Sequence, residues 1–432
     1  MGLLKAFANA FRVPDLRNKI LFTLLIIGVY RLGAHIPTPG IDVQAAQEIA
    51  AQASTGGALG FINLFSGGAL TQMAVFALGI MPYITASIIM QLLTVVIPRL
   101  EAWSKEGESG TKKITQWTRY LTVVLAVLQS TGIAFLFNRG AEQLGFPPGV
   151  QLIPDFTFGN VSLIVLSLTA GTSLVMWLGE LITQRGIGNG MSILIFASII
   201  STLPSEYLAI YQQESIAVFI GLVFIAILVV VAVVTVEQGQ RRIPVQYAKR
   251  VVGRRMYGGT STYIPLKVNQ AGVVPIIFAS SVLYIPTLLQ NTIQSPGLQN
   301  WIDNNLLNSG SVTHMALYGL LIVFFTYFYT AITFNPVDVS DNMKKYGGFI
   351  PGIRPGRQTA EYLDRILTRI TLPGALFIAA IALMPNIFLA TQGIQRLPFG
   401  GASILITVGV TLETMKQIES QLMMRHYEGF LK

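Results

Sequence analysis

Nucleotide chemistry needs a loop that holds phosphate, and two glycine-containing stretches come nearest to one. GESGTKK, residues 107–113, lacks the glycine spacing of the phosphate-binding motif G-x-x-x-x-G-K-[ST]. RGIGNGMS, residues 185–192, follows no predicted strand and opens an apolar segment, which argues against a dinucleotide site. Neither H-E-x-x-H nor G-x-S-x-G occurs in the sequence. We therefore predict that the chain is not an enzyme and that it draws energy from a partner or a gradient.

Metal and thiol chemistry find no support either. The sequence contains no cysteine, and its three histidines, His35, His314 and His426, lie far apart. Disulfides, thiol chemistry and a local histidine metal motif are therefore excluded. We expect neither a cofactor nor a metal site.

The composition indicates a membrane protein. Hydrophobic residues make up 52% of the chain and charged residues 11%, which is too few charges to cover a soluble body of 432 residues. Charged residues precede the first apolar run, which leads directly into further membrane sequence, so no cleavable signal is evident. Apolar segments predict ten transmembrane helices, near residues 20–37, 73–97, 117–137, 161–183, 187–203, 215–236, 268–290, 313–334, 366–390 and 398–416.

The basic residues predict the orientation of these spans. An even number of spans returns both termini to the same side of the membrane. Of the 29 Lys and Arg residues, only Arg31, Arg139 and Arg396 fall on the other side. Because Lys and Arg accumulate in cytoplasmic loops, we predict that both termini are cytoplasmic.

Ten spans also divide into two halves of five, residues 1–206 and 207–432. An odd number of spans in each half makes the halves insert in opposite directions, although no repeat is evident letter for letter. Such inverted pairing places a shared path at the junction of the halves. The predicted fold is an all-α polytopic membrane protein with two inverted five-helix halves around a central path.

The stretch from Gly60 to Pro98 departs from an ordinary span. Its first part, residues 61–72, is a short amphipathic piece interrupted by Gly67 and Gly68 and is too short to cross a bilayer. Residues 73–97 are long enough to span. One face of this predicted helix is apolar in the middle and polar toward one end, with Ile80, Ile84, Ser87 and Gln91 at helical spacing.

Two long loops on the predicted cytoplasmic side are strongly basic. Residues 237–269 contain strand-like stretches around a glycine-containing turn, as in a projecting hairpin. Residues 334–365 carry further basic residues among Gly and Pro. Such charge could anchor the chain beside anionic lipid, which accounts for charge near the span ends. Charge at the loop tips instead favours docking of an acidic or nucleic-acid surface.

A gradient-driven transporter is the main alternative function. Proton or sodium coupling usually leaves Asp, Glu or His near mid-membrane. Here Glu180 and Glu413 lie toward span ends, and no span centre carries an acid. The polar side chains within the spans are uncharged, and they could serve only as interhelical hydrogen bonds. They concentrate on the second, third, seventh and eighth spans and include Ser87, Gln91, Gln129, Ser130, Thr131, Ser280, Ser281, Thr326 and Thr330.

Six motifs along the chain stand out together, namely INLFSGGAL, ALGIMPYITASIIMQLL, RGIGNGMSILIF, GQRRIPVQYAKR, PLKVNQAGVVPIIFASS and GFIPGIRPGRQTAEYLDRIL. They resemble the SecY family, the central subunit of the bacterial protein-translocation channel. The resemblance covers essentially the whole chain, including the ten-span layout and both large loops. It implies a channel in the cytoplasmic membrane that passes unfolded polypeptides outward and releases apolar segments sideways into the lipid bilayer.

The resemblance also implies functional positions. In that family a ring of aliphatic side chains closes the pore, because a narrow apolar constriction excludes water and ions. The matching positions are Ile80, Ile84, Met191, Ile195, Ile277 and Ile406. Met191 departs from the all-isoleucine ring, although its adaptable side chain can still fill the gap. A plug in the outer funnel corresponds to residues 61–72 and includes Phe61, Ile62, Asn63, Leu64, Phe65, Ser66, Gly67 and Gly68.

By the same resemblance, a lateral gate lies between the second and third spans and the seventh and eighth. Its polar side chains would be Ser87, Gln91, Gln129, Thr131, Ser280, Ser281 and Thr326. The basic loops would dock the SecA motor ATPase and ribosomal RNA through Arg241, Arg242, Lys249, Arg250, Arg254, Arg255, Arg354 and Arg357. Further implied partners are the subunits SecE and SecG, signal peptides and translocating polypeptides. A secondary transporter of a small solute and a purely structural scaffold are the competing functions.

Overall fold

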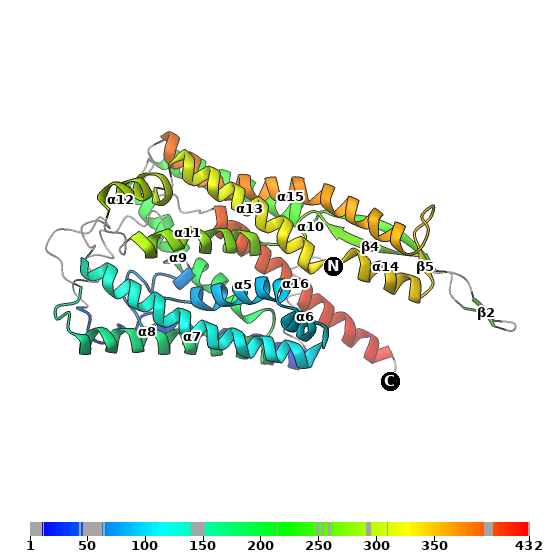
Figure 1. Ribbon diagram of the computed structural model, residues 1–432, viewed down its shortest axis with the longest axis horizontal. Helices are drawn as coiled ribbons and strands as arrows, with labels where there is room; N and C mark the ends of the chain where they lie inside the picture. Colours follow the sequence, from blue (N-terminus) through cyan, green and yellow to red (C-terminus); the bar gives the residue numbers. More distant parts are fainter. Residues whose placement is uncertain are drawn as a thin grey trace.

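The computed structural model describes most of the chain. The described residues are 11, 13–42, 45, 63, 65–139, 152–213, 215–247, 250–252, 255–257, 261–290, 295–308, 310–392 and 401–430. Most of them are helical, and the named strands gather toward one end of the molecule (Figure 1). The predicted all-α fold class is confirmed.

Helices overlap every predicted span. The first part of the chain forms α2 (Pro14–Gly33), α5 (Met81–Val96), α6 (Pro98–Lys105), α7 (Glu108–Arg139), α8 (Phe158–Arg185) and α9 (Gly190–Gln213). The second part forms α10 (Ile216–Gln238), α11 (Val274–Gln290), α12 (Pro296–Ile302), the π-helical turn η1 (Asp303–Leu307), α13 (Val312–Thr333), α14 (Pro336–Lys345), α15 (Arg357–Gln392) and α16 (Gly401–Phe430). The predicted boundary at residue 206 falls within α9, so the division into halves stays a prediction.

Six helical stretches in the described part of the chain are long and apolar enough to cross a membrane. They are Glu108–Phe135, Phe158–Arg185, Gly190–Gln212, Ile216–Gln238, Val312–Lys345 and Arg357–Pro385. Helices α5 and α6 qualify only as a pair, and they are bent by 101° relative to each other. Helices α2 and α16 carry several charged residues, which lowers their mean hydropathy.

The helix predicted over residues 73–97 begins later than expected, at Met81. The preceding residues form turns, because Gly79 adopts a φ of +53°, a left-handed conformation that interrupts a helix. Pro82 then occupies the first turn of α5, where the absence of an N–H group costs nothing. Residues 67–80 therefore pack as compact turns against neighbouring helices.

The first basic loop forms the predicted hairpin. Strand β1 (Gln240–Tyr247) pairs antiparallel with β4 (Ser261–Lys267), and β5 (Gly348–Phe349) extends the sheet on the other edge of β1. At the tip, β2 (Arg250–Val252) pairs with β3 (Arg255–Tyr257). This tip projects beyond the helices along the long axis of the molecule (Figure 1).

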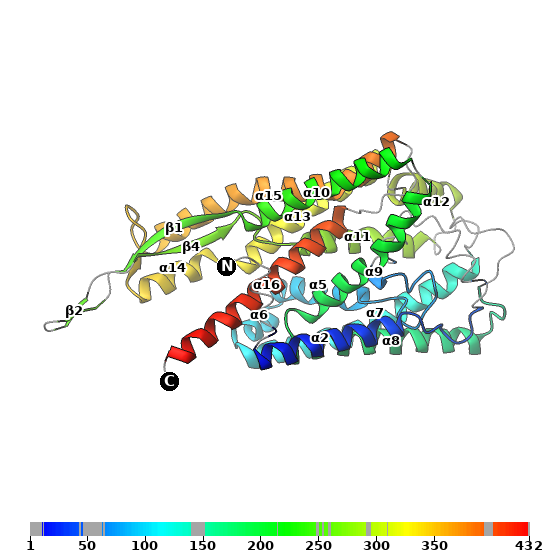
Figure 2. The same cartoon turned by 180° about the vertical axis from the view of Figure 1, so that it is seen from behind.

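The long helices form two groups with α16 between them. Helices α2 and α5–α8 lie on one side, and α10, α11, α13 and α15 lie on the other (Figures 1 and 2). Helix α16 runs diagonally and contacts α9, α10 and α15. The largest hydrophobic core takes residues from both groups and from α9 and α16.

Candidate functional site

Six aliphatic side chains predicted to act together lie in one buried core. We call them the aliphatic cluster, and they are Ile80, Ile84, Met191, Ile195, Ile277 and Ile406. Their exposed fractions do not exceed 9%, and Ile406 is fully buried. They come from the start of α5 and from α9, α11 and α16, so both helix groups contribute. The structure thus brings the six residues into one hydrophobic core, and their role in sealing a pore stays a prediction.

Met191 packs directly against α8. A Cβ atom added to Gly179 would lie only 2.5 Å from the Met191 sulfur, so any larger residue at position 179 would displace this side chain. Because methionine is flexible and unbranched, its side chain can fill the space that Gly179 leaves. The departure from isoleucine at position 191 is therefore matched by a glycine on the neighbouring helix.

The segment that resembles a plug is described from Phe65 onward, together with Asn63. Phe61, Ile62 and Leu64 lie outside the described residues. Phe65 and Ser66 are fully buried, and Phe65 belongs to the same hydrophobic core as the aliphatic cluster. Gly67 and Gly68 have φ angles of +65° and +87°, which end the helical turn as the sequence predicts.

Main-chain contacts fix the turns after this segment to the residues that follow α2. The amide of Thr38 donates to the carbonyl of Met73, and the amide of Val75 donates to the carbonyl of Ile36. Met73 is a non-glycine residue with a positive φ of 47°, a conformation that the surrounding structure must enforce. The turns after the segment are consequently anchored on one side of the molecule.

The polar side chains of the predicted lateral gate lie on the four expected helices. Helix α5 packs on α7 and α11 packs on α13, while α5 and α11 also contact each other. Ser87, Gln91 and Thr131 are half-buried, whereas Gln129, Ser280, Ser281 and Thr326 are buried.

Most of the gate hydroxyls bond to their own helices. Thr131, Ser281 and Thr326 each donate to the carbonyl four residues earlier. Ser280 is different, because its Oγ also lies 3.1 Å from the hydroxyl of Tyr318 on α13. The contact of Ser280 therefore joins α11 to α13. No signal in the sequence had paired Ser280 with Tyr318.

The basic residues of the first loop lie on and beyond the sheet. Arg241 and Arg242 are exposed on β1, and the guanidinium of Arg242 stacks over the ring of Tyr263 at 4.8 Å. Arg250 begins β2 and Arg255 begins β3 at the projecting tip. Lys249 and Arg254 lie outside the described residues.

The second loop presents Arg354 on a braced turn. Arg354 is exposed, while Ser340 and Thr359 beneath it are almost fully buried. Ser340 Oγ donates to the carbonyl of Gly356 at 2.6 Å, and Thr359 Oγ1 donates to the carbonyl of Arg354 at 2.9 Å. These bonds hold the turn in place, and the docking role of Arg354 stays a prediction. No pattern in the sequence indicated either bracing residue.

Arg357 is the first residue of α15 and is also exposed. It forms an ion pair with Glu361 one helical turn later, at 2.9 Å. Exposed pairs of this spacing contribute little to stability, and the docking role of Arg357 stays a prediction.

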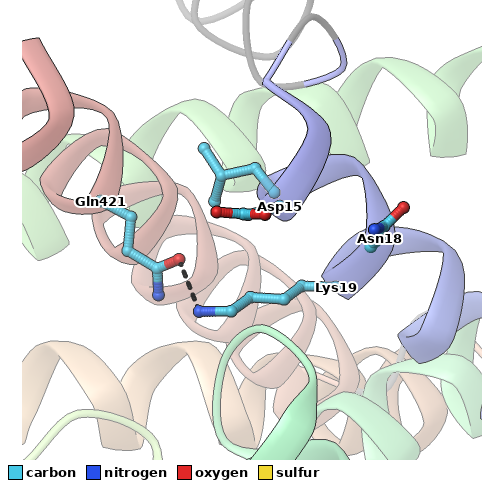
Figure 3. A pocket seen from close by; sticks show the side chains of 5 residues that line it. Asp15, Asn18, Lys19 and Gln421 are labelled. Carbon is cyan, nitrogen blue, oxygen red and sulfur yellow. Dashed lines mark hydrogen bonds between the residues drawn. The ribbon is translucent and has the colours of Figure 1, made fainter.

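A cleft of about 330 Å³ lies apart from the aliphatic cluster, where α2 meets α16 (Figure 3). Its lining residues are Asp15, Leu16, Asn18, Lys19 and Gln421. Lys19 Nζ donates to Gln421 Oε1 at 3.3 Å across the cleft. Beside it, Leu16 and Ile418 belong to a small hydrophobic core. This contact ties the first described helix to the last.

The family model described as SecY matches residues 74–415. This chain belongs to the SecY family. A relative from Streptomyces coelicolor, described as protein translocase subunit SecY, is 61% identical over the full length of both chains. A SecY relative from Mycobacterium bovis is 54% identical, again over the full length of both chains. The resemblance that the motifs predict is confirmed.

Solved structures show that the fold is shared with channels of the SecY and Sec61 type. "The structure of a protein conducting channel" aligns with a TM-score of 0.62 at 17% identity and covers 94% of this chain and 92% of that one. Sec61 in the canine ribosome-channel complex aligns with a TM-score of 0.58 at 17% identity, with the same coverage. As a SecY family member with long apolar helices, the chain is a multi-pass membrane protein.

Proposed function

We propose that this chain is the protein-conducting subunit of a translocation channel in the bacterial cytoplasmic membrane, with both termini in the cytoplasm. The observation that carries this proposal is the aliphatic cluster, in which helices of both groups and α16 contribute side chains to one buried core. The names of the full-length relatives support the same function over a small-solute transporter.

The aliphatic cluster would form the seal of the channel. A narrow apolar constriction excludes water, so an ion meets a gap in which its hydration is lost. Isoleucine and methionine side chains can move apart around an extended polypeptide and close again when it has passed. The 61–72 segment would close the channel on the outer side as a plug. A channel subunit of this kind needs no catalytic residue of its own.

Apolar segments of the translocating polypeptide would be released sideways into the bilayer where α5 contacts α11. Half-buried Ser87 and Gln91 on α5 weaken an apolar contact in lipid, which would let a hydrophobic signal segment compete for the seam. The helices α7 and α13, which carry Gln129 and Thr326, would support the two sides.

The basic surface would bind the partners that supply energy. The sheet, its tip and the turn of Arg354 lie toward one end of the molecule (Figure 1). Arginine pairs bidentately with carboxylate or phosphate, so it would suit both carboxylates on the SecA motor and the phosphates of ribosomal RNA. Together with the membrane potential, these partners would drive the translocating polypeptide through the channel. The SecE and SecG subunits would complete the complex.

Reconstitution tests the proposed function directly. The chain is placed in liposomes with SecE, and SecA, ATP and a signal-bearing precursor are added. We expect the precursor to become resistant to external protease only when ATP is present. A matched reaction without this chain measures the background. Protection that does not exceed the background would contradict the proposal.

A further inference from the structure

One charged side chain in the outer part of the bundle is explained by no function given so far. Arg31 lies near the carboxyl end of α2 and is half-buried. Among the described residues it forms no ion pair with a carboxylate. A charged residue within a membrane span is costly and usually has a specific partner. The partner of Arg31 is a main-chain carbonyl, since Nη1 donates to the carbonyl oxygen of Gly67 at 2.8 Å.

A second contact reaches the adjacent carbonyl. The fully buried hydroxyl of Tyr30 lies 2.7 Å from Ser198 Oγ on α9 and 3.4 Å from the carbonyl oxygen of Ser66. Ser198 Oγ donates its own proton to the carbonyl of Leu194, so it can accept from Tyr30. The Tyr30 proton is thus shared between Ser198 and Ser66, and Arg31 makes the stronger contact because it is charged.

The fit around Gly67 is close. A Cβ atom added there would lie 2.8 Å from Arg31 Nη1 and 3.0 Å from Ser198 Cα. On the other side, a Cβ atom added to Gly79 would lie 3.1 Å from the carbonyl oxygen of Phe65. Residues 65–67 are therefore enclosed between α2, α9 and the turn that precedes α5.

We propose that Arg31, assisted by Tyr30 and Ser198, forms a latch that holds the plug in its closed position. The proposal rests on the proposed function of the 61–72 segment as a plug. Because the latch binds the carbonyls of residues 66 and 67, it depends little on the side chains of the plug.

The same arrangement connects the latch to the seal. Ser198 lies one turn after Ile195 on α9, and Ile195 belongs to the aliphatic cluster. A translocating chain that pushes α9 away from α2 separates Ser198 from Tyr30. The plug is then released by the movement that widens the seal, and it is held again when α9 returns.

The test measures exposure of the plug, separately from conduction. The sequence contains no cysteine, so an Ala69→Cys substitution introduces one thiol at a position that is 1% exposed. The chain is assembled with SecE in membranes, and a membrane-impermeant maleimide is applied from the outer side. We expect Arg31→Gln to raise the labelling rate about tenfold, as for loss of one charge-assisted hydrogen bond.

Two glycine variants provide a second route to the same result. Gly67→Ala clashes with Arg31 and Ser198, so it should raise labelling as Arg31→Gln does. Because it leaves Arg31 in place, it also tests the latch if the Arg31→Gln variant fails to accumulate. Gly68→Ala introduces a similar backbone strain at φ +87°, but no atom lies within 4 Å of its added Cβ. We expect Gly68→Ala to raise labelling less than Gly67→Ala does.

The outcomes separate the latch from the plug. Labelling that is equal in the parent, Arg31→Gln and Gly67→Ala overturns the latch. Ion conductance of a channel that lacks residues 61–72 tests the plug itself. If labelling rises in Arg31→Gln but the deletion conducts no more ions than the parent, the latch stands and the plug function fails.

Discussion

The hydroxyl of Ser280 on α11 lies 3.1 Å from the hydroxyl of Tyr318 on α13, and both side chains are buried. The ring of Phe278 on α11 also packs edge-on against Phe325 and Tyr329 of α13. These contacts all lie on the same side of the proposed lateral gate. We therefore expect α11 and α13 to move as one unit when α11 separates from α5.

We predict that Ser280 and Tyr318 are energetically coupled. Tyr318→Phe and Ser280→Ala each remove the hydrogen bond and should lower the free energy of unfolding by about 1 kcal/mol. The double variant should lose less than the sum of the two, because the bond can be lost only once. Unfolding in a detergent titration measures all three variants. Strictly additive losses would show that the two hydroxyls do not interact.

Arg119 and Glu180 provide a second stability prediction. The guanidinium of Arg119 on α7 holds the Glu180 carboxylate on α8 with two hydrogen bonds, at 2.8 and 2.6 Å. The Glu180 side chain is only 16% exposed, so Arg119→Met leaves a carboxylate with little solvent and no partner. We expect a loss of about 1–3 kcal/mol. The melting temperature in detergent measures this loss.

The matched variant for this pair removes both charges. Arg119→Met combined with Glu180→Gln leaves no unpaired ion, so it should recover part of the stability lost by Arg119→Met alone. If the double variant is the less stable of the two, the ion pair is not the source of the effect.

The gate residues lead to a prediction about signal recognition. Replacing Gln91 and Gln129 together with Leu makes the seam between the two helix pairs more apolar, so it should open less readily for weak signals. Export of precursors with weakened signal sequences should fall several-fold relative to a precursor with a strong signal. Ser130→Ala is the control, because its hydroxyl bonds within α7. If precursors with weakened signals are exported by the Leu variant as well as by the parent, this role is excluded.

Arg354 tests the docking surface. Arg354→Glu reverses a charge on the braced turn and should lower SecA-dependent translocation at least tenfold while the complex still assembles. Lys345→Glu changes the net charge by the same amount at an exposed position on α14. It should have a smaller effect, because Lys345 lies outside the turn. Translocation and co-purification with SecE are measured for both. Equal losses in the two variants would point to net charge as the cause.

A polar side chain in the aliphatic cluster should open a path for ions. Ile406 is fully buried on α16, and Ile406→Asn lets water enter a constriction that is otherwise apolar. We expect measurable conductance of the resting channel in planar bilayers, whereas Ile406→Val should stay closed. A closed channel in Ile406→Asn would remove this residue from the seal.

Patterns along the sequence predicted the elements better than their contacts. Strand-like stretches around a glycine-containing turn in residues 237–269 predicted the hairpin, and apolar runs predicted a helix at each span. The start of α5 was misplaced by several residues, because apolar residues 73–80 look the same in a turn as in a helix. Only the φ of Gly79 and the position of Pro82 decide where the helix begins.

Contacts between distant residues could not be predicted in this way. Tyr30 and Ser198 are 168 residues apart, and each alone resembles an ordinary polar residue in a span. Arg31 was visible as an isolated charge, but its partner is a carbonyl group, which every residue has. The six aliphatic positions were grouped as one set only through the resemblance to a family, since buried isoleucine occurs throughout such a bundle.

The base of the hairpin has a mechanical consequence. Residues 268–273 connect β4 directly to α11, and contacts at Val268 and Asn269 hold the start of this connection. Asn269 Nδ2 donates to Glu237 at the end of α10, and Gly374 of α15 packs so closely on the Val268 carbonyl that an added Cβ would lie 2.4 Å away. We expect the hairpin to pivot about these contacts, because the tip lies far from them and α11 follows them directly. A partner that tilts the tip would then apply torque to α11 without entering the membrane.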